Sequence, residues 1–257
     1  MQTSHSPMPL AEQRRRHLPA GAAFGWLAEG WRDLWRNPLP SLLYGLAVFL
    51  LSVAVVWLLF RLEIDYILFP ALAGFMVVGP LVAIGLYRKS QDLEEGVAPS
   101  LSRMVFVRAA SGSQVWFAGA ILCLLMLVWM RAAVIIYALF VGLRPFPGLD
   151  HVVSMLLSTP EGLGMIAVGT VVGGLFAAFS FAISTFAIPM LLAERTDAFT
   201  AMGTSISLVF RNLRVMLAWG FIVLALTMLG IATGLVGLIV IFPLLGHGTW
   251  HSYRAIR

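Results

Sequence analysis

The stretch LPSLLYGLAVFLLSVAVVWLLF, residues 39–60, contains 22 consecutive residues without a charged side chain. An α-helix needs about 20 apolar residues to cross the hydrocarbon core of a bilayer. This stretch is therefore long enough for one membrane span. Four further runs meet the same condition, and a sixth follows the fifth after a short glycine-containing turn. The predicted spans cover approximately residues 39–60, 66–87, 113–140, 163–192, 213–229 and 232–249.

The composition agrees with a membrane protein. Of the 257 residues, 60% are hydrophobic and only 11% are charged, whereas a soluble domain carries about 25% charged residues. A transmembrane β-barrel would show short segments that alternate between apolar and polar residues, but the apolar runs here are long and unbroken. The predicted fold is all-α and polytopic, with six transmembrane helices in one membrane domain, residues 21–257.

Several segments outside the spans have a predicted location. Residues 1–20 contain prolines and three consecutive arginines and are predicted to form a disordered basic cytoplasmic arm. Residues 22–36 predict an amphipathic interfacial helix, with tryptophans on one side and Asp33 among the charged residues on the other. Residues 194–212 predict a second surface helix. Residues 88–100 mix charges of both signs and predict a solvated cytoplasmic loop.

The positions of the basic residues predict the orientation in the membrane. With six spans, Arg61, Arg131 and Arg144 fall on one side, and the remaining 14 of the 17 Lys and Arg residues fall on the other. Cytoplasmic segments of membrane proteins carry the excess of basic residues. Both termini are therefore predicted to lie in the cytoplasm. Since the basic residues cluster at span ends, the net charge of +5 does not indicate nucleic-acid binding.

The sequence favours three repeated hairpins. An arginine precedes each odd-numbered span and an aromatic residue follows it eight positions later, while each even-numbered span carries one proline in its cytoplasmic half. Internal repeats are common in membrane proteins built around a central axis. The alternative is that arginines and aromatics recur at span ends in any membrane protein. The residues of the pattern are Arg36 and Tyr44, Arg108 and Trp116, Arg211 and Trp219, and the prolines Pro80, Pro189 and Pro243.

His247 and His251 form a candidate pair of haem or metal ligands, because a spacing of four residues places both imidazoles on one helix face. In the first hairpin the corresponding residues are Ile84 and Arg88, so a ligand pair is not preserved. Most metal sites also need more than two protein ligands. We therefore expect the pair to mark the cytoplasmic edge of the sixth span, with no metal and no cofactor. Ligand binding remains the alternative.

Arg131 interrupts the third apolar run. One interpretation is that this span starts near Ser111 and that Arg131 reaches the outer headgroups, so that residues 132–143 protrude or lie flat. The other interpretation is a contact with an anion or a lipid phosphate in the outer leaflet.

Small residues and prolines provide further candidates. In the fourth span, small residues recur every four positions, which is typical of close helix packing within a bundle or between two copies. The prolines of the even spans free backbone carbonyls one turn earlier, and such breaks either kink the helix or bind ions or substrates. The candidates for helix packing are Gly169, Gly173 and Ala177.

Four blocks of sequence carry a resemblance to a known family. They are FGWLAEGWRDLWRNPLPSLLYG (24–45), GFMVVGPLVAIGLYRKSQDLEEG (74–96), IPMLLAERTDAFTAMGTSI (188–206) and PLLGHGTWHSYR (243–254). Together they resemble the bacterial domain of unknown function 2189, a family of predicted integral membrane proteins, over roughly residues 22–254. Some of its members are labelled as cytochrome c oxidase subunits. The resemblance implies a six-span inner-membrane protein and brings no established activity.

The oxidase label can be tested on the residues. A haem-copper catalytic subunit needs about six membrane-embedded histidines to hold two haems and a copper. The chain offers two at the edge of a span, His247 and His251. It therefore cannot be that subunit, although it can accompany one.

These features lead to a functional expectation. The twelve acidic residues fall in the arm, in loops or at span ends, so a proton relay across the bilayer lacks carboxylates. Phosphate-binding and nucleophile motifs are absent from the sequence. We expect a non-enzymatic structural or accessory component of membrane complexes, with lipid, other membrane complexes or a second copy as partners. The first alternative is a carrier or channel for a small or lipidic solute, contacted by Arg131 and the prolines. The second is a haem- or metal-binding membrane protein.

Overall fold

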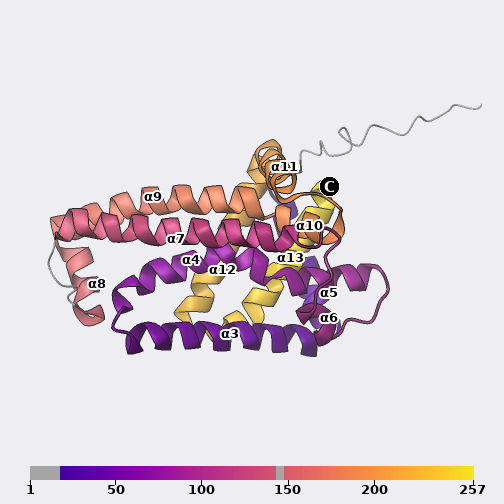
Figure 1. Ribbon diagram of the computed structural model, residues 1–257, viewed down its shortest axis with the longest axis horizontal. Helices are drawn as coiled ribbons and strands as arrows, with labels where there is room; N and C mark the ends of the chain where they lie inside the picture. Colours follow the sequence, from indigo (N-terminus) through magenta and orange to yellow (C-terminus); the bar gives the residue numbers. More distant parts are fainter. Residues whose placement is uncertain (1–17, 143–147) are drawn as a thin grey trace, which may run out of the picture.

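The computed structural model describes residues 18–142 and 148–257, and within these ranges the regular secondary structure is helical (Figure 1). Five segments are long and apolar enough to cross a membrane: Pro38–Arg61, Asp65–Glu94, Gln114–Val141, Pro160–Ala193 and Leu213–Ala232. Each overlaps one of the first five predicted spans, so the all-α fold with several membrane helices is confirmed. The predicted arm lies, apart from residues 18–20, outside the described residues.

The order of the elements follows the chain without a strand in the described part. They are α2 (Ala22–Trp35), α3 (Pro38–Arg61), η1 (Asp65–Ile67), α4 (Leu68–Val82), α5 (Ile84–Glu94), α6 (Leu101–Val105), α7 (Gln114–Val141), α8 (Leu149–Ser158), α9 (Pro160–Ser184), α10 (Ala187–Ala193), α11 (Ala198–Arg211), α12 (Leu213–Ala232) and α13 (Leu238–Ile256).

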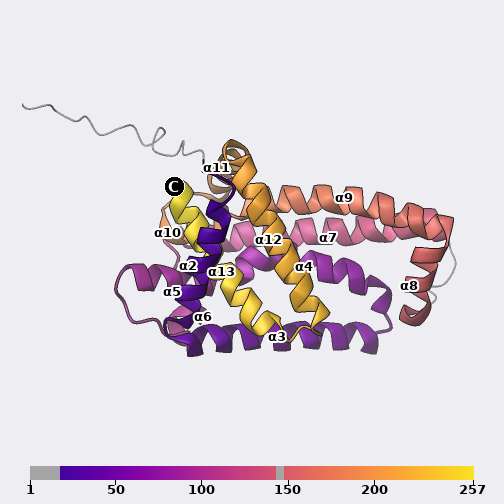
Figure 2. The same cartoon turned by 180° about the vertical axis from the view of Figure 1, so that it is seen from behind.

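Helices α3, α4, α7 and α9 run along the long axis of the molecule, with α12 and α13 crossing behind them (Figures 1 and 2). Helix α8 lies at one end. The opposite end holds α5, α6, α10 and the C-terminus, and we call it the polar end. Helix α13 packs against α2, α3 and α5, while α7 packs against α4 and α9. Large buried side chains such as Tyr87, Phe186, Trp250 and Tyr253 place the core at the polar end.

Local sequence explains where several helices begin and end. Thr159 caps α9 by accepting a hydrogen bond from the Gly162 N–H at 3.0 Å, and Pro160 occupies the first helical position. Helix α12 ends at Ala232, and Gly234 (φ +65°) turns the chain before α13 begins at Leu238. The hairpin predicted at this place is confirmed, in contrast to one long helix. Glycine suits the turn because it adopts positive φ without strain.

The prediction that Asp33 lies on the solvated side of α2 is wrong. The buried face of this helix consists of Ala23, Trp26, Gly30, Asp33 and Leu34, and Asp33 is only 6% exposed. These residues recur at intervals of three and four and so share one face. The aromatic residues of the predicted apolar side, Phe24, Trp31 and Trp35, are instead exposed.

The prediction of a solvated loop over residues 88–100 is also wrong in its first half. Helix α5 continues to Glu94, and Lys89, Ser90 and Asp92 are fully buried. Mixed charge indicates a solvated segment only where the charges lack partners within the protein. Here they find such partners, as described below.

Helix α7 continues without a break through Arg131. Arg131 lies 17 residues after Gln114, which corresponds to about 26 Å along the helix axis. This distance is close to the thickness of the hydrocarbon core, about 30 Å. The exposed Arg131 side chain can therefore reach one edge of the bilayer, and residues 132–141 extend the helix in the same direction.

Candidate functional site

Helices α2, α3 and α13 meet at the polar end through close backbone contacts. A methyl group added to Gly30 of α2 would lie 2.7 Å from the backbone nitrogen of Gly248 in α13. A methyl group added to Gly45 of α3 would lie 2.1 Å from the carbonyl oxygen of Ile239 in α13. Glycines permit such approach, which is typical of helix contacts in membrane proteins. Together with α5, these helices bring polar side chains within hydrogen-bonding distance.

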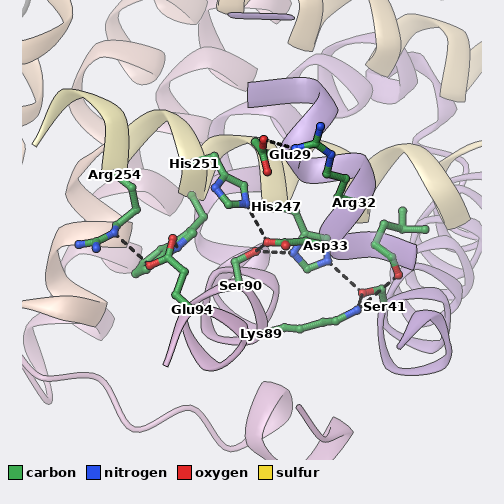
Figure 3. A network of polar contacts seen from close by, with 12 residues as sticks. Glu29, Arg32, Asp33, Ser41, Lys89, Ser90, Glu94, His247, His251 and Arg254 are labelled. Carbon is green, nitrogen blue, oxygen red and sulfur yellow. Dashed lines mark hydrogen bonds and ion pairs between the residues drawn. The ribbon is translucent and has the colours of Figure 1, made fainter. Parts of the chain in front are cut away.

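Six of these side chains form a continuous set of contacts (Figure 3), which we call the polar network: Asp33, Ser41, Lys89, Ser90, His247 and His251. The Lys89 ammonium donates to the Asn37 carbonyl oxygen at 2.8 Å and to Ser41 Oγ at 2.7 Å. Ser41 Oγ lies 2.9 Å from His247 Nε2, and Ser90 Oγ lies 2.8 Å from His247 Nδ1.

The network ends on a carboxylate. Ser90 donates to Asp33 Oδ2 at 2.7 Å, and His251 Nε2 lies 2.8 Å from the same oxygen. Asp33 comes from α2 and His251 from α13, so this carboxylate joins an interfacial helix to the C-terminal helix.

The donors and acceptors fix the tautomer of His247. Lys89 can only donate, so Ser41 accepts from it and directs its own proton to His247 Nε2. Ser90 gives its proton to Asp33 and therefore accepts from His247 Nδ1. The imidazole of His247 thus carries its proton on Nδ1 and is neutral. A directed chain of hydrogen bonds leads from the buried ammonium through Ser41, His247 and Ser90 to the buried carboxylate.

The charge of Asp33 follows from its contacts. Burial raises the pKa of the Asp33 carboxyl, but hydrogen bonds from His251 and Ser90 outweigh burial and hold this pKa below its ordinary value of 3.8. Asp33 is therefore ionised at neutral pH. Buried charges are tolerated when they are paired and hydrogen-bonded, and the polar network provides both conditions for Asp33 and Lys89.

Ion pairs at the rim extend the polar network. Asp92 is fully buried and accepts two hydrogen bonds from Arg103, each 2.7 Å long, and forms a 2.8 Å ion pair with Arg88. Glu94 forms a 3.0 Å ion pair with Arg254 and accepts a hydrogen bond from Trp250 Nε1. Helices α5, α6 and α13 are thereby connected.

The two predicted histidines have separate roles in this geometry. Both ring nitrogens of His247 are engaged by serines, and the side chain is fully buried. His251 is directed to Asp33. In the described part of the chain, His, Cys, Asp and Glu do not gather in groups of three or more that could hold a metal ion.

Sequence reasoning missed Asp33, Ser41, Lys89 and Ser90 as network members. A signal existed for one of them. Asp33 lies seven residues after Trp26 and three after Gly30, which is the spacing of one helix face. For the other three the decisive contacts join residues more than 45 positions apart, and no local pattern reveals them.

A second site is an apolar cavity of about 640 Å³ between α4, α7, α9, α12 and α13. Its volume lies within the usual range of ligand pockets. On α9 the lining extends from Met165 to Thr185, a helix length of about 30 Å, which matches the thickness of the hydrocarbon core. The described residues that line it include no Asp, Glu, Lys, Arg or His.

The structure distributes the other predicted residues between the cavity and its surroundings. Gly169, Gly173, Ala177 and Pro80 line the cavity. An added methyl group on Gly169 would meet nothing within 4 Å, whereas on Gly173 it would lie 2.9 Å from the Trp129 ring of α7. The small residues thus leave space as well as allowing helix packing. The following lie outside the lining: Pro189, Pro243, Arg131, His247 and His251.

These observations define a helical integral membrane protein with an apolar intramembrane cavity and a buried polar network at one end. Residues 68–193 match the family described as "Predicted integral membrane protein (DUF2189)". The predicted resemblance is confirmed over these residues, which comprise α4 to α10 and so include Lys89, Ser90 and the cavity walls on α4, α7 and α9. No curated protein and no solved structure matches the chain.

Proposed function

We propose that the protein is a non-enzymatic membrane protein that binds a lipidic molecule in its intramembrane cavity. The observation that carries this proposal is an uncharged cavity of about 640 Å³ whose lining on α9 is as long as the bilayer core is thick. A hydrocarbon chain is the molecule available at this depth, and burial of a long chain needs an extended apolar wall. This function corresponds to the alternative of a carrier for a lipidic solute.

The cavity test uses two substitutions on α9. Gly169→Phe places a ring where an added side chain finds open space inside the cavity. Val171→Phe is the matched control, because Val171 is 64% exposed and is not part of the lining. Native mass spectrometry of the purified variants reports the lipids that remain bound. We expect Gly169→Phe to lose bound lipid while Val171→Phe retains it. Equal retention in both variants would exclude the cavity as the binding site.

We further propose six spans, with α13 as the sixth and both termini in the cytoplasm of a bacterial inner membrane. Support comes from the basic residues Arg88, Lys89, Arg103 and Arg254, which belong to helices that meet at the polar end. Basic residues concentrate on the cytoplasmic side of membrane proteins. The scheme of three repeated hairpins stays a prediction.

The accessory role beside a membrane complex also stays a prediction. Affinity purification from native membranes tests it. Co-isolation of an oxidase or another complex would support the accessory role, and isolation of the protein alone would count against it.

A further inference from the structure

One polar atom beside the cavity lacks a partner. Trp219 of α12 is fully buried and borders the cavity, and its Nε1 has no hydrogen-bond partner among the described residues. Buried N–H groups without an acceptor are rare, because the donor has lost the water to which it would otherwise bind. The indole N–H can only donate.

Neighbouring groups locate Trp219 near the polar end of the cavity. Its ring lies against Gly248, where an added methyl group would be 2.6 Å from the ring edge, and Gly248 adjoins His247 of the polar network. Tyr87, two residues before Lys89, also borders the cavity and is 1% exposed. Its hydroxyl takes part in none of the hydrogen bonds found between described side chains.

Other hydroxyl groups of the lining are already engaged as donors. Each donates to a carbonyl oxygen of its own helix, three or four residues earlier. This leaves the Trp219 N–H as the buried lining group that can only donate and has no described acceptor. The engaged hydroxyls are those of Ser180, Ser184, Thr185 and Thr249.

The charge of the lining limits the ligand further. An ionised group would lose its hydration in the cavity without meeting a counter-charge, which is strongly unfavourable. A group that only accepts hydrogen bonds would satisfy the Trp219 N–H. Resting on the proposed lipid-binding function, we infer that the cavity selects a long-chain molecule whose uncharged head presents a carbonyl oxygen to Trp219.

The experiment compares three probes of equal chain length: methyl oleate, 1-octadecene and oleate. The first has a neutral carbonyl, the second has no acceptor, and the third is ionised at pH 8. Binding of radiolabelled probes is measured on full-length, delipidated protein in a maltoside detergent, which carries no carbonyl group. We expect methyl oleate to bind about fivefold to tenfold more tightly than 1-octadecene, the effect of one hydrogen bond. Oleate should bind more weakly than its ester.

Trp219→Phe keeps an aromatic ring and removes the N–H. We expect it to remove the preference for methyl oleate over 1-octadecene while the affinity for 1-octadecene stays unchanged. Trp31→Phe is the control, since Trp31 is 47% exposed on α2 and should keep the preference. Tyr87→Phe deletes one oxygen and provides an independent measurement if Trp219→Phe does not fold. It should lower the affinity for methyl oleate alone.

The outcomes separate this inference from the proposed function. If Gly169→Phe lowers binding of all probes but wild-type protein binds the ester and the alkene equally, the cavity binds lipid and the carbonyl inference is wrong. An unchanged preference in Trp219→Phe, or in Tyr87→Phe where the former does not fold, would likewise overturn it, with a water molecule as the partner of the indole. If Gly169→Phe changes no probe, the proposed function itself is wrong.

Discussion

The substitution Asp33→Ala tests whether the polar network holds α2 on the bundle. Asp33 is 6% exposed and accepts hydrogen bonds from Ser90 at 2.7 Å and His251 at 2.8 Å. Its removal leaves both donors unpaired and Lys89 without the carboxylate at the other end of the chain. Two hydrogen bonds to a charged group, or one partner of a buried charge pair, correspond to about 3–5 kcal/mol of unfolding free energy.

The measurement is the free energy of unfolding in mixed micelles, with sodium dodecyl sulfate as denaturant and tryptophan fluorescence as the signal. Glu29→Ala is the matched control on the same helix, because Glu29 pairs with Arg32 and both side chains are largely exposed. An exposed pair contributes about 0–1 kcal/mol. If Asp33→Ala costs no more than Glu29→Ala, the polar network does not stabilise the fold and the reasoning is wrong.

A second substitution isolates the charge coupling within the same experiment. Lys89→Met in the Asp33→Ala background removes the ammonium that lost its counter-charge. The double variant should therefore be more stable than the sum of the single effects predicts, by about 1–3 kcal/mol. Additive effects would show that Asp33 and Lys89 do not interact through Ser41, His247 and Ser90.

Three further predictions concern pH, packing and topology. Because the pKa of Asp33 is lowered in the folded protein, its stabilisation is present above about pH 4 and is lost as the pH falls through the lowered value; Asp33→Asn should flatten this acid limb of an unfolding curve. Gly45→Ala should cost more than about 3 kcal/mol, since the methyl group meets a backbone oxygen at 2.1 Å, whereas Gly203→Ala, with nothing within 4 Å, should be neutral or slightly stabilising in a melting experiment. In a cysteine-free background, an impermeant maleimide added to intact cells should label Leu62→Cys and spare Arg257→Cys; the reverse pattern would place the polar end outside.

The membrane helices could be predicted because one physical requirement dominates them. A segment that crosses lipid must be apolar over its whole length and satisfy its own backbone hydrogen bonds, so residues 39–60 reveal a helix without any tertiary information. The hairpin at Gly234 was also predictable, since positive φ favours glycine at a tight turn. These features depend on neighbours in the sequence alone.

The polar network was not predictable because its contacts join distant parts of the chain. Lys89 resembles any basic residue at the end of a span, and only the arrival of Ser41 and of the Asn37 carbonyl makes its burial tolerable. His247 was expected at a membrane edge. Its position between two serines depends on helix packing that glycine contacts determine.

The two sites follow from the weak forces between helices in lipid. Apolar side chains gain little by leaving lipid for another apolar surface, so packing and polar contacts have to determine how membrane helices associate. The first four spans bury only 17% of their most apolar residues, whereas the polar end concentrates the buried charges and the large buried aromatics. Trp219 links both regions, since its ring contacts Trp26 of α2 at 5.9 Å and borders the cavity. The helices are thus tied together at one end, and the space that remains between them beyond this tie is the cavity that a lipid chain can fill.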